Sequence, residues 1–166
     1  MNLAKTELMI HGHSCCEVRG INYSIICDPW LVGSAYWRSW FNFPATPNFE
    51  SLVKNWSKQK NLYFYITHLH WDHFHGPTLK KIIKTCPNNY KFLIPKTPEN
   101  RLFSDLESIV GKNQIIELTH AKKYNLQEDI SILSFQAGPF FADSAISIFS
   151  KNFSLLNIND AKIFKL

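Results

Sequence analysis

The stretch Thr67-His68-Leu69-His70-Trp71-Asp72-His73 decides what this sequence predicts about fold and function. Together with His75 it holds four of the seven histidines within eight residues, where an even spread over 166 residues would give about 0.3. It follows the apolar run Leu62 to Ile66, a candidate buried strand, and precedes a candidate helix. Functional residues of layered α/β domains collect at such strand ends, so the position of the stretch favours chemistry.

The spacing of these side chains is typical of metal ligands. In an extended segment His68 and His70 point to the same face and can hold one ion, while the following turn aims Asp72 and His73 a few ångströms onward, toward a second ion. Imidazole and carboxylate ligands suit zinc, and also iron or manganese, and a pair of ions would activate a bridging water. His75 is a candidate further ligand or substrate contact, although nothing in the spacing requires either role.

The segments around this motif predict short strands and a few helices, in an α/β layered or α+β domain that spans residues 1–166. A loop rich in aromatic residues, from Pro29 to Pro47, interrupts them. Asn48 caps a helix to about Lys58, Pro77 begins a second helix, and Thr97-Pro98 opens a third to about Val110. The expected strands are Leu8 to His11, Cys15 to Arg19, Tyr23 to Cys27, Leu62 to Ile66, Phe92 to Ile94, Gln114 to Leu118, Ile130 to Phe135, Ala145 to Phe149 and Phe153 to Ile158.

Composition excludes several classes of protein. The chain is 45% hydrophobic and 19% charged, enough for a real core, and it has neither an apolar run of membrane-spanning length nor a signal-peptide core at its start. We therefore expect a cytoplasmic protein without membrane contact. Its four cysteines form no CxxC pair and are expected to be reduced and buried. The net charge of +5 comes from dispersed lysines, which makes a nucleic-acid partner less expected than a small anionic substrate.

The motif resembles the HxHxDH signature of the metallo-β-lactamase superfamily. The segments 11–14, 25–30 and 78–81, and the pairs Asp143-Ser144 and Asn159-Asp160, are similar to the branch that contains ascorbate-6-phosphate lactonase and the hydroxylase of CMP-N-acetylneuraminate. The resemblance implies an αββα sandwich with His68 and His70 on one metal, Asp72 and His73 on the other, and Asp160 bridging them. It also implies that Asp28 holds the metal-binding loop, although a strand-end turn with Pro29 is an alternative.

The chain departs from the family pattern in its second half. A family histidine is absent before Asp143, a second one is absent after Asp160, and the last strands and helix of the sandwich are absent as well. Each metal then lacks one ligand, and the sandwich is predicted to be truncated. We expect a homo-oligomer or a partner chain to cover the hairpin Ala145 to Ile158 and to donate the missing ligand, unless the aromatic loop folds over it. The paired Cys and His ligands of a Rieske cluster are also missing.

Three functions follow as hypotheses. The first is a metal-dependent hydrolase of a small anionic, sugar-like or nucleotide-sugar substrate, in which Asp72 orients a metal-activated hydroxide. His13 would line the site, and Trp30 and Arg38 of the aromatic loop would contact the substrate, or the loop would only cover the core. The second is a catalytically degenerate binding or assembly module. The third is a non-haem iron hydroxylase.

Overall fold

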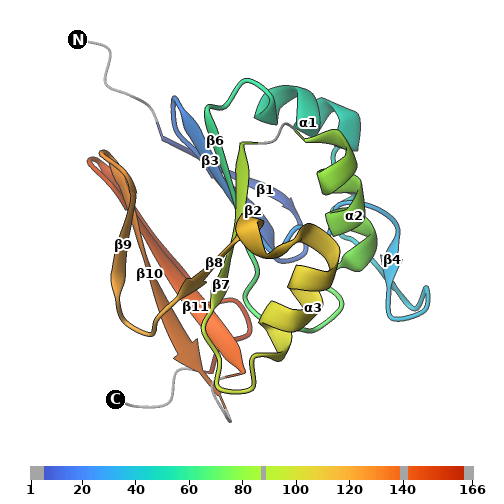
Figure 1. Ribbon diagram of the computed structural model, residues 1–166. Coiled ribbons are helices and arrows are strands. Elements are labelled where there is room, and N and C mark those ends of the chain that lie inside the picture. The colour runs from blue at the N-terminus through green and yellow to red at the C-terminus, as the bar shows by residue number, and fades with distance from the viewer. Residues whose placement is uncertain (1–5, 87–88, 139–141, 163–166) are drawn as a thin grey trace.

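The computed structural model describes residues 6–86, 89–138 and 142–162, and these residues form helices and two large β-sheets that are arranged in layers (Figure 1). The larger sheet has the strand order β1-β2-β3-β6-β7-β8. Its first three strands form an antiparallel meander, and β3, β6, β7 and β8 run parallel. The strands are β1 (Glu7–Gly12), β2 (Cys15–Arg19), β3 (Tyr23–Cys27), β6 (Asn61–Tyr65), β7 (Tyr90–Pro95) and β8 (Ile115–Leu118).

Helices make the crossovers between the parallel strands and cover one face of this sheet (Figure 1). They are α1 (Phe49–Trp56), α2 (Gly76–Thr85) and α3 (Arg101–Val110). The side chain of Asn48 accepts a hydrogen bond from the Ser51 backbone N–H, which caps α1 as predicted, and Pro77 lies in the first turn of α2. The prediction for α3 was wrong at its start: Asn100 is left-handed, so the helix begins at Arg101 and not at Thr97.

The smaller sheet packs on the other face and has the order β12-β11-β10-β9. Its strands, all antiparallel, are β9 (Lys123–Gln127), β10 (Ile130–Ala137), β11 (Asp143–Ser150) and β12 (Phe153–Asn157). The sequence did not predict β9, or the short pair β4 (Ser34–Ala35) and β5 (Trp40–Phe41) in the aromatic loop. Among the described residues no helix covers the outer face of the smaller sheet.

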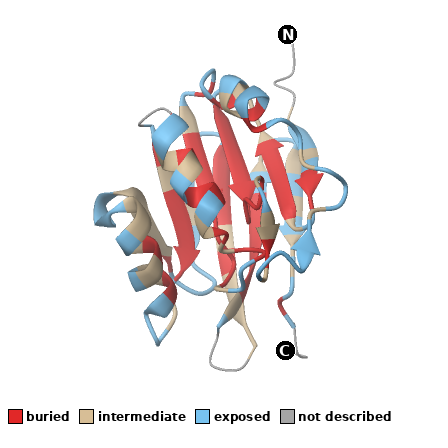
Figure 2. Cartoon of the chain, turned by 90° about the vertical axis from the view of Figure 1, so that its right-hand side faces the viewer, coloured by how far each residue is buried: buried red, intermediate tan, exposed pale blue. Residues whose placement is uncertain are grey.

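Strand periodicity explains why the larger sheet has a core on each side. Ile26, Leu62 and Phe64 point toward the helices, whereas their neighbours Ile25 and Tyr63 point toward the smaller sheet. Figure 2 shows these central strands as buried and the outer faces of the helices as exposed. The four cysteines are buried and free, which confirms the prediction made for them. No helix in the described ranges is both long and apolar enough to span a bilayer.

Strand direction brings distant parts of the sequence to one end of the sandwich. Because β2 is antiparallel to β3, the turn between β1 and β2 lies beside Asp28 at the end of β3, and the parallel strand β6 ends there too. β11 begins at this end with Asp143, and the chain returns to it after β12. The Ser144 hydroxyl joins the two sheets here by donating to the Thr67 carbonyl (2.8 Å).

One edge of the sandwich is open. β1 and β12 are the edge strands of their sheets, and a groove of about 410 Å³ lies between them. Leu8, Ile10, Leu156 and Ile158 line this groove and are exposed. No residue of the aromatic loop lines this groove. The part of the loop that forms β4 lies beside α2, on the side of the molecule away from the smaller sheet (Figure 1). The alternative that this loop folds over the hairpin is therefore wrong.

Candidate metal centre

Two groups of metal-ligand side chains meet at this end of the sandwich. One contains His68, His70 and Asp160, here called the His68 group. The other contains His13, Asp72 and His73, here called the Asp72 group. Within each group the ligand-type nitrogen and oxygen atoms all lie within 4.8 Å of one another. The loop after β6, the turn between β1 and β2, and the segment after β12 thus contribute to one centre.

Asp160 connects the two groups. Its Oδ2 lies 3.4 Å from His73 Nε2 and 3.9 Å from His68 Nε2. The Asp160 side chain is 55% exposed, so it closes the outer side of the centre while the histidines on its inner side are buried. A carboxylate in this position can contact both members of a pair of ions.

His73 is held from behind by a buried carboxylate. Its Nδ1 lies 3.0 Å from Asp28 Oδ2, and Asp28 also accepts hydrogen bonds from the Thr67 N–H (2.8 Å), the Thr67 hydroxyl (2.9 Å) and the Asn159 amide. His73 Nε2 is buried, has no hydrogen-bond partner, and faces the carboxylates of Asp72 and Asp160, each 3.4 Å away. A buried nitrogen in this state fits a metal ligand, because burial without a partner is otherwise costly.

The charges around His73 also favour a cation. Burial by itself lowers the pKa of His73, but the carboxylates of Asp28, Asp72 and Asp160 outweigh it and raise this pKa above its usual value. A metal ion at His73 would take the place of the proton and supply the positive charge that these carboxylates stabilise.

His68 is oriented in the same manner by its own neighbours. Its Nδ1 lies 2.9 Å from the Thr67 hydroxyl and 3.4 Å from Asp143 Oδ1, and its Nε2 lies 2.7 Å from His70 Nδ1. Burial and the nearby His73 lower the pKa of His68, which favours the neutral imidazole. Neutral imidazole is the form that binds metals.

Asp72 is fixed through both of its oxygens. Its Oδ2 lies 2.8 Å from His13 Nε2, and its Oδ1 accepts a hydrogen bond of 2.7 Å from the Tyr36 hydroxyl. Although burial opposes it, the hydrogen bonds from Tyr36 and His13 and the nearby His73 lower the pKa of Asp72. Burial and this hydrogen bond raise the pKa of Tyr36 to about 12. The Asp72 side chain is therefore anionic, and Tyr36 is a protonated donor, near neutral pH.

Three further residues that the sequence singled out lie around the two groups without joining them. His75 caps α2: its Nδ1 accepts from the Thr78 N–H, and its Nε2 lies 3.2 Å from the Ser34 carbonyl. Trp30 is buried, and its ring packs edge-on against that of His13 at 5.4 Å. Arg38 lies on the exposed part of the aromatic loop and supplies no atom to either group.

The roles of several residues at the centre were not predicted from the sequence. His13 was expected only to line the site, yet its Nε2 lies among the ligand atoms of the Asp72 group. Tyr36 was not singled out, and Asn159 was named only in the pair Asn159-Asp160, with no contact predicted for it. The signals available were the Gly-His-Ser turn for His13 and the aromatic composition of the loop for Tyr36, and neither shows which carboxylate the side chain meets. His120 is exposed, accepts from the Gln136 N–H (3.0 Å) and belongs to neither group.

A cleft opens from the His68 group to solvent. It encloses about 410 Å³ and is lined by both histidines of that group together with Asp143, Asp160 and Lys162. Lys162 is exposed and places a positive charge at this cleft.

Comparison with solved structures shows which known fold the chain has. The chain superimposes on CmlA, a diiron β-hydroxylase from Streptomyces venezuelae, with a TM-score of 0.66 and 18% identity, over 96% of this chain and 30% of that one. It superimposes on zinc-bound PqqB from Methylobacterium extorquens with a TM-score of 0.51 and 11% identity, over 86% of this chain and 50% of that one. Both neighbours have the metallo-β-lactamase fold. This chain is a metallo-β-lactamase-fold protein. The fold class predicted from the sequence is thus confirmed.

Sequence relatives of this metallo-β-lactamase-fold protein are much longer than the chain. A Mycobacterium tuberculosis protein that bears the name Rieske 2Fe-2S iron-sulfur protein is 30% identical over 160 residues, which cover 91% of this chain and 29% of that protein. Cytidine monophosphate-N-acetylneuraminic acid hydroxylase from Macaca mulatta is 30% identical over 91 residues, 53% of this chain and 14% of the hydroxylase. The chain therefore spans less than a third of the length of these relatives. No family model matches it.

Proposed function

We propose that this chain is the catalytic domain of a two-metal enzyme and that its chemistry is oxidative, of the hydroxylase type, on a small anionic substrate. The position of Asp160, whose Oδ2 faces nitrogen ligands of both groups, is the observation that carries the two-metal part of the proposal. His68 and His70 would hold one ion, and His13, Asp72 and His73 the other.

The donor set fits such a centre. It consists of imidazole nitrogens and carboxylate oxygens, which suit iron, zinc and manganese alike. When bound, iron supplies redox chemistry with O₂, whereas zinc supplies Lewis acidity without redox change. The names of the similar proteins favour iron, because they include a Rieske iron-sulfur protein, a hydroxylase and a diiron hydroxylase.

The protein's own side chains would prepare the site for this chemistry. Asp28 leaves His73 Nε2 free to bind, and Thr67 together with Asp143 orients His68. Lys162 at the mouth of the cleft would attract an anionic substrate and fix its charged end. Hydroxylation places one atom of O₂ in a C–H bond and reduces the other to water with two electrons and two protons. The reaction therefore requires an external reductant.

Hydrolysis of an anionic, sugar-like substrate is the second candidate. The zinc-bound state of PqqB and the water-accessible cleft beside the His68 group favour it. The hypothesis of a degenerate binding module rested on missing ligands. His13 adds to the Asp72 group a ligand-type side chain that the sequence prediction did not count, which weakens this hypothesis for one ion. Among the described residues the His68 group consists of the predicted His68, His70 and Asp160.

The two chemistries can be separated without knowing the substrate. The chain is loaded with iron, reduced anaerobically with dithionite and mixed with O₂, and the optical change on reoxidation is followed; the zinc-loaded chain is tested on bis(p-nitrophenyl) phosphate. The proposal predicts rapid reoxidation of about two irons per chain and no chelator-sensitive hydrolysis. Hydrolysis by the zinc form, with iron that does not react with O₂, would favour the second candidate.

Paired variants control for loss of the site. His70→Ala should abolish reoxidation at one ion, whereas His120→Ala changes an exposed histidine outside both groups and should not alter the rate. Failure of the wild-type chain to bind more than about half an equivalent of iron, zinc or manganese would support the binding-module hypothesis.

A further inference from the structure

The aromatic loop sends one polar atom into the metal centre. Between β4 and β5 the chain makes a tight turn, and the Tyr36 hydroxyl at its start donates to Asp72 Oδ1 at 2.7 Å. The other oxygen, Asp72 Oδ2, faces His13 Nε2 at 2.8 Å and His73 Nε2 at 3.4 Å. Tyr36 thus occupies the oxygen of Asp72 that is turned away from the two imidazoles.

The turn that delivers this hydroxyl is strained. Tyr36, Trp37 and Arg38 have φ values of 47°, 54° and 70°, so three consecutive residues with side chains adopt the left-handed conformation. Each costs roughly 1 kcal/mol or more relative to ordinary backbone. A sequence under no constraint would place glycine or asparagine at some of these positions.

Aromatic packing holds the turn in place against this strain. The Tyr36 ring packs edge-on against Trp40 at 5.1 Å and lies nearly parallel to Trp71, with centroids 6.0 Å apart. Trp37 contacts Trp71 at 4.4 Å. Trp71 precedes Asp72 in the chain, so the same contacts fix the loop and the ligand relative to each other.

We propose that Tyr36 is a positioning residue that fixes Asp72 as a one-oxygen ligand and thereby sets the affinity of the Asp72 group for its metal ion. The inference rests on the two-metal centre of the proposed function. Without the hydroxyl, the contact with His13 Nε2 alone restrains the Asp72 carboxylate, so Oδ2 is held less firmly toward His73. Loss of a partner that orients a ligand typically weakens metal binding about 10- to 100-fold.

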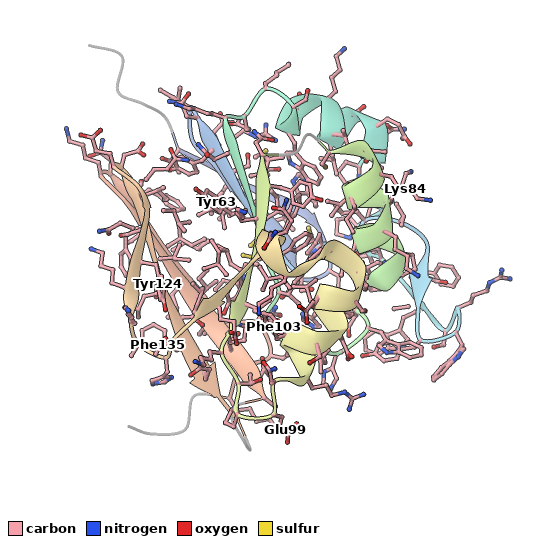
Figure 3. All side chains as sticks on the ribbon, in the orientation of Figure 1. Tyr63, Lys84, Glu99, Phe103, Tyr124 and Phe135 are labelled. Carbon is pink, nitrogen blue, oxygen red and sulfur yellow. The ribbon has the colours of Figure 1, made fainter. Side chains whose placement is uncertain are left out.

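Zinc titration of the full chain tests this inference. Binding of Zn²⁺ is measured by competition with a chromophoric chelator for the wild type, Tyr36→Phe and Tyr63→Phe. Tyr63 is the matched control: its hydroxyl lies 3.3 Å from the Leu126 carbonyl, and Figure 3 shows it between the two sheets with Tyr124. We expect the dissociation constant of one ion to rise about 10- to 100-fold in Tyr36→Phe, and neither constant to change in Tyr63→Phe.

A double-mutant cycle distinguishes positioning from a general structural role. If Tyr36 acts through Asp72, Tyr36→Phe should have no further effect on zinc binding in an Asp72→Ala background, which lacks the acceptor of the Tyr36 hydroxyl. Two zinc ions bound by the wild type with unchanged constants in Tyr36→Phe, or an equal effect of Tyr36→Phe in both backgrounds, would overturn the inference and leave the two-metal centre intact. Fewer than two zinc ions in the wild type would instead overturn the proposed function. Circular dichroism of the metal-free variants verifies folding.

Discussion

Replacement of Asp28 by Asn should test whether a residue that binds no metal itself controls metal binding by orienting His73. Asp28 is completely buried, and its carboxylate accepts from the Thr67 N–H and hydroxyl, from Asn159 and from His73 Nδ1. Asn has the same shape but only one acceptor oxygen. The Thr67 N–H belongs to the backbone and cannot turn, so the amide oxygen should face it and the amide NH₂ should face the remaining three donors.

The consequence for His73 is specific. The Thr67 hydroxyl and the Asn159 amide can rotate, but His73 can accept from an NH₂ group only if its proton moves from Nδ1 to Nε2. Nε2 is the atom that faces Asp72 and Asp160, and a protonated Nε2 cannot bind a metal. Hydrogen bonds to a charged group contribute about 1.5–3 kcal/mol each, and we expect the net loss of one. The metal-free variant should therefore be about 1.5–3 kcal/mol less stable.

Urea denaturation of the metal-free protein measures the loss of stability, and chelator competition measures zinc affinity. Asp105→Asn is the control, because its side chain is 47% exposed and only 3.7 Å from Arg101 in an i,i+4 pair, worth no more than about 0.5 kcal/mol. A change below about 1 kcal/mol in Asp28→Asn, with zinc affinity unaltered, would refute the reasoning that Asp28 orients His73.

Four further predictions test other parts of the account. Glu17 is buried, and hydrogen bonds from His11, Ser24 and Arg19 outweigh its desolvation and lower its pKa to about 2. The ionised Glu17 should therefore stabilise the fold above pH 4.5, and this stabilisation should be lost as the pH falls to 2. In acid unfolding, the wild type should lose about 3 kcal/mol more than Glu17→Gln between pH 4.5 and 2. The double variant His68→Ala and His70→Ala should lose at least one equivalent of bound iron in elemental analysis. Asn48→Ala should remove the α1 cap and lower the unfolding free energy by about 1 kcal/mol in urea. The open edge between β1 and β12 should be covered in solution by a second copy of the chain, and sedimentation that shows only monomer at high concentration would contradict this.

The central part of the fold and of the site could be predicted because it is local in sequence. The spacing of His68, His70, Asp72 and His73 after a buried strand is visible without any knowledge of tertiary contacts. Asn48 and Pro77 give helix starts through the same local rules. The late start of α3 shows the limit of these rules, because a threonine-proline pair can open a turn as well as a helix.

The remaining contributions depend on strand order and could not be predicted from spacing. His13 reaches Asp72 because β2 pairs antiparallel with β3 and β3 pairs parallel with β6, which places the β1–β2 turn beside the metal-binding loop. Tyr36 reaches it through a turn of three left-handed residues that no local propensity favours. Asn159 reaches Asp28 only when the two sheets pack face to face.

The proposed function requires that this metallo-β-lactamase-fold chain holds two metal ions, one on each side of Asp160. Crystals of the iron-loaded protein, measured at the iron absorption edge, give the positions of the ions directly. We expect two anomalous peaks about 3.5–4 Å apart, one bound by His68 and His70 and one by His13, Asp72 and His73, with Asp160 between them. A single peak, or peaks that Asp160 does not touch, would contradict it.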